Sequence, residues 1–72
     1  MASDNVVSDS TYNLLAILLS KLEGLEAYDT YLEDMDDGEE RNAIEQIRRD
    51  DERHAELLRS TIEKLVREKG LR

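Results

Sequence analysis

The segment RDDERHAELL, residues 49–58, places a carboxylate and the only histidine of the chain three residues apart, at Asp51 and His54. Continuing a helical face through this segment in both directions shows that Asp51 and His54 lie in the middle of an apolar stripe. The apolar members of that stripe are Ile44, Ile47, Leu58, Ile62 and Leu65. The pattern predicts a long helix whose packed face is interrupted by two titratable side chains.

Two interpretations of the Asp51 and His54 pair follow from the residues. Side chains at positions i and i+3 point the same way from a helix, and a carboxylate and an imidazole together can hold one metal ion. Alternatively, the pair is a hydrogen-bonded polar layer inside a helical bundle, because buried polar groups in proteins are mostly satisfied by partners. The local sequence leaves both interpretations open.

Composition indicates an all-α protein that self-associates. The 72 residues contain no proline or tryptophan, and 39% of them are charged, which is typical of helical bundles. Two helices without a third layer bury too little apolar surface for a stable monomer. We therefore expect at least a homodimer, with four residues buried between the chains: Ile44, Ile47, Leu58 and Ile62.

Charge and residue usage narrow the partners and the chemistry. A net charge of −8, from 10 basic and 18 acidic residues, disfavours nucleic acid and anionic membranes and favours cations. The longest apolar run, Leu14 to Leu19, is too short for a membrane span or a signal sequence, so we expect a cytoplasmic chain. Cysteine is absent, and no nucleophile–base motif or phosphate-binding loop is found.

The order of elements predicts a single helical hairpin after a flexible arm over residues 1–8. A first helix over about residues 9–35 begins at Ser8 or Asp9 as N-cap, and a second helix over about residues 39–69 ends at Gly70. The turn over residues 36–39 contains Gly38, a candidate left-handed cap for the first helix. Asp37 and Glu40 resemble a capping box for the second. A turn this short requires antiparallel helices.

Counting outward from the turn places Asp51 and His54 opposite the region of the first helix around Leu22 and Leu25. Helical projection puts Lys21 and Asp29 about 40° to either side of the buried face of that helix, and Glu26 about 100° away. We therefore expect Lys21 and Asp29 to be the charges that the first helix buries.

Four short segments, together with this spacing, resemble the ferritin-like superfamily, and within it the rubrerythrin-like and encapsulated-ferritin branch. The resemblance covers about residues 14–66 and rests on LEGLEAY at 22–28, DDGE at 36–39, AIEQI at 43–47 and DDERHA at 50–55. It implies a half-ferritin, in which two hairpins dimerise into a four-helix bundle. It also implies a protein shell as a partner, and hence a location inside a protein nanocompartment.

The resemblance further implies an iron site, with oxidation of Fe(II) by dioxygen as the activity. In ferritin-like bundles, a Glu-x-x-His motif and a glutamate from another helix ligate two iron ions. His54 matches the histidine of that motif, Asp51 stands where the motif has glutamate, and Tyr28 matches the tyrosine of the first helix. Iron, as a di-iron pair, or another divalent metal is the cofactor that this match implies.

Lys21 departs from the family pattern, because it occupies the position of the glutamate seven residues before the tyrosine. An ammonium group opposes cation binding by Coulomb repulsion. Glu26 or Asp29 are the candidates to replace the missing carboxylate ligand, with Lys21 and Tyr28 next to the metal. The alternative is a metal-free structural or interaction module, in which Lys21, Asp51 and His54 form a polar layer in place of the metal site.

Overall fold

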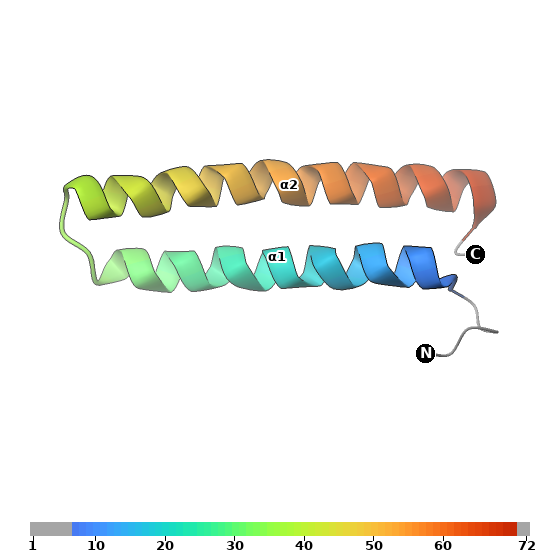
Figure 1. Cartoon of the computed structure of the whole chain (residues 1–72), viewed down its shortest axis with the longest axis horizontal. Coiled ribbons are helices and arrows are strands. Elements are labelled where there is room, and N and C mark those ends of the chain that lie inside the picture. Colours follow the sequence, from blue (N-terminus) through green and yellow to red (C-terminus); the bar gives the residue numbers. More distant parts are fainter. Residues whose placement is uncertain (1–6, 71–72) are drawn as a thin grey trace.

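Two antiparallel helices form the whole of the described structure, a computed structural model that describes residues 7–70. Helix α1 spans Asp9–Glu33 and helix α2 spans Glu39–Lys69, and they lie side by side with the start of α1 and the end of α2 at the same end of the hairpin (Figure 1). The molecule measures 49 × 22 × 12 Å. The predicted all-α hairpin is confirmed, whereas the arm predicted for residues 1–8 lies mostly outside the described residues.

Helix α1 begins at a side-chain cap. The Ser8 hydroxyl accepts a hydrogen bond from the backbone N–H of Thr11 at 3.1 Å, and its backbone is extended, as an N-cap residue requires. The Thr11 side chain also lies 3.0 Å from the Ser8 hydroxyl and is 4% exposed. This arrangement gives a free backbone N–H in the first turn of α1 an acceptor. Ser8, rather than Asp9, is therefore the N-cap.

The connection differs from the sequence prediction at both of its ends. Helix α1 ends at Glu33, two residues before the predicted end, with Asp34 as its C-cap. Gly38 is instead the N-cap of α2, with a φ of 146° that side-chain-bearing residues rarely adopt. The cap has no side-chain hydrogen bond, so the predicted capping box of Asp37 and Glu40 does not form. With Gly38 as the N-cap, Asp37 lies before the start of α2.

Arg41 of α2 adds a side-chain donor at the end of α1. Its Nη1 donates hydrogen bonds to the carbonyl oxygens of Leu32 at 2.8 Å and Met35 at 3.1 Å. The Leu32 oxygen also accepts a hydrogen bond from the backbone N–H of Met35 at 3.2 Å. The last turn of α1 contains no basic residue, so Arg41 places a cation at the negative end of the helix dipole. Arg41 also lies 3.5 Å from Glu45. One side chain therefore fixes the turn to both helices.

The two helices bury little apolar surface between them. Within residues 7–70, the only buried apolar residues are Ala55 and Ile62, which are 7% and 8% exposed. Ile62 was expected between two chains, but it is already buried within one hairpin. Ile47, expected at the same interface, remains 44% exposed. Alanine at the contact allows the helices to approach closely, yet the hairpin encloses very little apolar volume.

Candidate functional site

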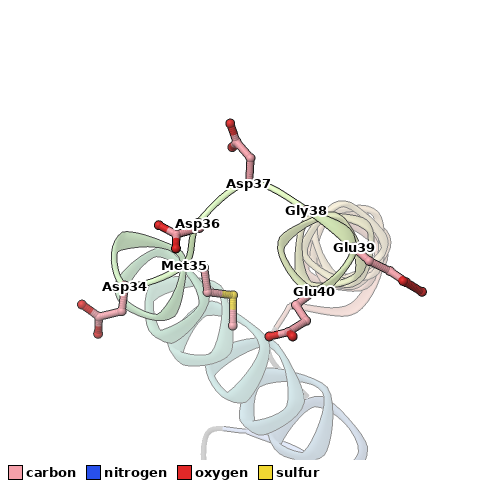
Figure 2. Close-up of a pocket in the computed structure, with 7 residues that line it drawn as sticks. All are labelled: Asp34, Met35, Asp36, Asp37, Gly38, Glu39 and Glu40. Carbon is pink, nitrogen blue, oxygen red and sulfur yellow. The ribbon is translucent and has the colours of Figure 1, made fainter.

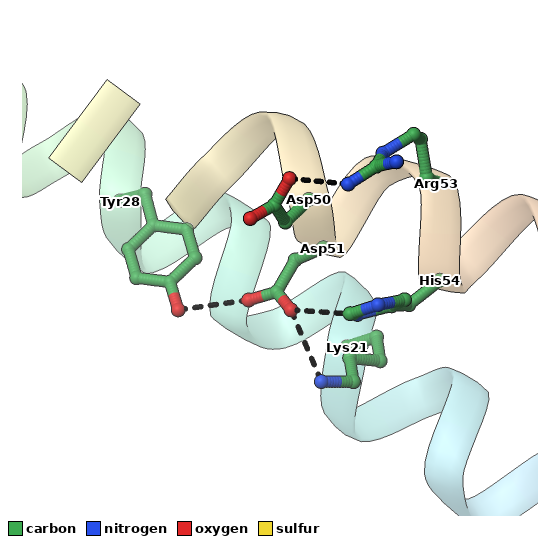
Figure 3. Close-up of polar contacts among 6 residues, drawn as sticks. All are labelled: Lys21, Tyr28, Asp50, Asp51, Arg53 and His54. Carbon is green, nitrogen blue, oxygen red and sulfur yellow. Dashed lines mark hydrogen bonds and ion pairs between the residues drawn. The ribbon is translucent and has the colours of Figure 1, made fainter. Parts of the chain in front are cut away.

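Asp51 is the centre of a polar cluster that joins the two helices (Figure 3). Its Oδ1 accepts a hydrogen bond from Lys21 Nζ at 3.1 Å, and its Oδ2 accepts one from the Tyr28 hydroxyl at 2.9 Å. His54 Nδ1 lies 3.4 Å from Oδ1, a longer and weaker contact. We call Lys21, Tyr28, Asp51 and His54 the Asp51 cluster.

Helical spacing brings these four side chains to one side of the hairpin. Lys21 and Tyr28 are seven residues apart, so two turns of α1 place them on the same flank. Asp51 and His54 are three residues apart on α2 and point the same way. The Asp51 side chain is 16% exposed and Lys21 is 35% exposed, whereas His54 at 55% lies at the edge. The predicted contact between Lys21 and Asp51 is present.

The hydrogen bonds of the cluster favour an ionised Asp51. The Tyr28 hydroxyl, and after it the Lys21 ammonium, lower the pKa of Asp51 below its usual 3.8. The same hydrogen bond raises the pKa of Tyr28 above its usual 10.0, because an ionised phenol would lose its donor and face a carboxylate. Asp51 is therefore ionised and Tyr28 neutral across the physiological range.

The structure separates the remaining predicted ligands from this cluster. Asp29 is 59% exposed, so the expectation that α1 buries it is wrong. Its carboxylate accepts a hydrogen bond from Arg48 Nε at 2.9 Å, which raises the pKa of Arg48. Leu18 and Leu25 lie between the flank of Asp29 and that of Lys21, and a 40° offset in projection places Asp29 at the border of the buried face, where its carboxylate reaches solvent. Glu26 is exposed.

The residues of one chain do not fit a di-iron centre. Within residues 7–70, no group of three or more histidine, cysteine, aspartate or glutamate side chains is placed to hold a metal ion. Asp51 and His54 form the one predicted ligand pair in contact, and Lys21 Nζ occupies the coordinating side of Asp51 Oδ1. A second chain would have to supply further carboxylate or imidazole ligands.

The acidic turn forms a hollow of about 410 Å³ between the ends of the helices (Figure 2). Its carboxylates diverge. Met35 and Glu40 point toward each other across the hollow, whereas Asp34, Asp37 and Glu39 point outward. A hard cation requires several oxygens at one point, so the turn does not have the geometry of a cation site. Glu39 and Glu40 lie in the first turn of α2, where negative charge is favourable.

Two contacts of the structure were absent from the sequence prediction. Tyr28 was expected beside the site but not as the donor to Asp51, and Arg41 was not expected to cap α1. The sequence did contain a signal for the contact of Arg41, because α1 ends without a basic residue and Arg41 lies in the first turn of α2. For Tyr28, no sequence signal distinguishes a donor from a packed aromatic ring.

At the level of fold, the described chain is an αα-hairpin with a polar cluster across it. Comparison with models of protein families, with curated proteins and with solved structures found no match. The ferritin-like resemblance therefore stays a prediction made from the motif residues. Neither α1 nor α2 is long and apolar enough to cross a membrane.

Proposed function

We propose that this protein is a structural interaction module, in which two hairpins dimerise into a four-helix bundle with the Asp51 cluster as a polar layer at the interface. The observation that carries the proposal is the small core of the hairpin. Ala55 and Ile62 are the only buried apolar residues within 7–70. A domain of this size with so little enclosed apolar surface is marginal alone, and association supplies the missing burial.

Charge selects the face that carries the Asp51 cluster as the dimer interface. Lys21 and Asp51 neutralise each other, and Tyr28 and His54 add no net charge when neutral. Two identical copies therefore meet there without repulsion, although the chain carries a net charge of −8. Exposed apolar residues flank the cluster on both helices, namely Ile17 at 47%, Tyr31 at 53% and Ile47 at 44%.

The cluster would give this interface its register. Covering it removes water from the ion pair of Lys21 and Asp51 and strengthens each hydrogen bond in the network. A shifted pairing would leave a buried charge without a partner, which costs more than the pair itself contributes. The polar layer thus favours one alignment of the helices over others.

A second candidate function is metal binding between two copies, as the ferritin-like resemblance implies. The observation that favours it is the position of His54, which is 55% exposed and lies beside Asp51. With its proton on Nδ1, the imidazole directs Nε2 to solvent, where a ligand set from two chains could form. Lys21→Glu tests this candidate with Co(II) as a probe. It exchanges a cation for a carboxylate, so affinity should rise if this position faces the metal, and unchanged affinity contradicts that arrangement.

Sedimentation equilibrium of native protein and two matched variants tests the proposed dimer. Ile47→Glu places a charge on the cluster face and should give monomers. Leu19→Glu is the control, because Leu19 is also exposed, at 57%, but lies on the other flank of α1, so its dimer should persist. A stably folded native monomer at micromolar concentration, or equal effects of the two substitutions, would overturn the proposal.

A further inference from the structure

We propose that a second face of the hairpin binds an amphipathic helix of a partner protein, one that carries an apolar stripe flanked by basic residues. Four exposed apolar residues of α1 recur at helical spacing and form what we call the leucine stripe: Tyr12 at 51%, Leu15 at 38%, Leu19 at 57% and Leu22 at 49%. Contiguous exposed apolar surface of this kind marks interaction sites.

The leucine stripe lies on the opposite side of the hairpin from the Asp51 cluster. Leu22 is one residue after Lys21 and therefore about 100° further round α1. Leu22 and Asp29 are seven residues apart and share a flank, and Asp29 pairs with Arg48 rather than with Asp51. A dimer formed through the cluster face would therefore leave the leucine stripe uncovered. The inference extends beyond the proposed function and does not rest on it.

Beside the stripe, a shallow groove of about 280 Å³ runs between the helices. Its apolar part comes from three leucines of α1 and one alanine of α2, and its polar border comes entirely from α2. The lining residues are Leu18, Leu22, Leu25, Ala55, Glu52, Glu56 and Arg59. Together, the stripe and the groove present the surface that a helix with apolar anchors at i, i+3, i+4 and i+7 requires.

Charge around this surface is negative, which selects a basic partner. The flank continues from Leu22 into Glu26 and Asp29 at the same spacing. The two arginines nearby do not balance it, because each is shared between two carboxylates: Arg48 contacts Asp29 and Glu52, and Arg59 contacts Glu56 and Glu63. A partner with lysine or arginine beside its apolar stripe would complement this surface.

A second copy of this chain does not supply that complement through the same stripe. Helix α1 contains five acidic residues and one basic residue, and the basic residue, Lys21, is engaged with Asp51 on the other flank. Two leucine stripes packed together would therefore place acidic helices side by side with no cation between them. Like charges across an interface suppress such a pairing.

The test uses fluorescence anisotropy with a labelled synthetic peptide of about 18 residues, long enough to form a helix on binding. Leucines at i, i+3, i+4 and i+7 form its apolar stripe, and lysine and alanine fill the other positions. A control peptide has glutamate in place of lysine. The native protein should bind the lysine peptide and not the glutamate peptide.

Protein variants show whether the leucine stripe is the binding surface. The double variant Leu19→Ser with Leu22→Ser should weaken binding about tenfold or more, since apolar anchors dominate such interfaces. Leu57→Ser is the control, because Leu57 is 64% exposed and points away from α1, about 200° round α2 from Ala55. Its affinity for the peptide should be unchanged. Circular dichroism of each variant should show that these exposed substitutions leave the helices intact.

Three results would overturn the inference. Equal binding by the double variant and the native protein would show that net charge alone attracts the peptide. Binding of the glutamate peptide as tight as that of the lysine peptide would show that the acidic residues around the stripe do not select a basic partner. Dissociation of the native oligomer by the double substitution, measured by sedimentation, would show that a second copy covers the leucine stripe.

Discussion

Lys21 of α1 and Asp51 of α2 are thirty residues apart in sequence, and the ammonium of one donates to the carboxylate of the other at 3.1 Å. This contact connects the middle of both helices, and Tyr28 donates to the second oxygen of the same carboxylate. Because Asp51 lies within the apolar stripe of α2, this contact is a polar determinant of how the helices align.

A double-mutant cycle should detect this contact. Lys21→Met and Asp51→Asn each remove one charge while keeping most of the side-chain volume. The coupling free energy from urea unfolding of the four proteins should be about 0.5–1 kcal/mol, the upper part of the range for exposed pairs, because Asp51 is only partly accessible. A coupling indistinguishable from zero would show that the contact is not formed in solution.

Tyr28→Phe should destabilise the hairpin, because the hydrogen bond to Asp51 is lost. The ring stays in place and only the hydroxyl is lost. The substitution should also raise the pKa of Asp51 toward its usual 3.8, because the largest cause of its depression is removed. Carboxyl chemical shifts followed by NMR during an acid titration measure this. An unchanged pKa of Asp51 would contradict the hydrogen bond from Tyr28. Tyr31→Phe is the control, since Tyr31 is 53% exposed.

The contribution of Asp51 to stability should depend on pH in a definite direction. Its pKa in the folded protein is lowered, so the unfolded chain takes up the proton first as pH falls. The stabilisation is present above the usual value of 3.8 and is lost as pH falls through the lower folded value. Native protein should therefore be more stable than Asp51→Asn at pH 7, with the difference shrinking under acid. Melts across the acid range measure this, and a constant difference would contradict it.

Arg41→Ala should destabilise the hairpin by about 1–2 kcal/mol, because the carbonyls of Leu32 and Met35 lose the charged donor and the helix dipole loses a cation. Arg53→Ala is the matched control. Arg53 pairs with Asp50 on the same helix and is 74% exposed, so its loss should cost less than about 0.5 kcal/mol. Equal losses for the two variants in urea unfolding would refute the capping role of Arg41.

Periodicity was sufficient to predict the hairpin, since both helices are long and carry regular apolar spacing. The contact between Lys21 and Asp51 was also predictable, because counting from a short turn fixes which levels of two antiparallel helices face each other. The details of the turn were not predictable in this way. Gly38 suits either a C-cap or an N-cap with positive φ, and only the path of the chain between the helices decides which one forms.

Projection was least reliable for charged side chains near the border of the buried face. Asp29 and Lys21 have similar offsets, yet Lys21 turns toward Asp51 and Asp29 turns outward to Arg48. The difference depends on which partner α2 presents on each flank, and a single helical wheel does not contain that information. The uneven distribution of exposed leucines on α1 likewise emerges only once α2 is in place.

Asp51 serves the fold, with its carboxylate engaged by Lys21 and Tyr28 of its own chain. Thermal melts of native protein and His54→Ala, each with and without Fe(II) under anaerobic conditions, distinguish this role from metal binding. A metal that binds only the folded state raises its melting temperature by mass action. Fe(II) should leave the melting temperature of both proteins unchanged. A rise in the native protein that His54→Ala abolishes would contradict it and would establish the metal site instead.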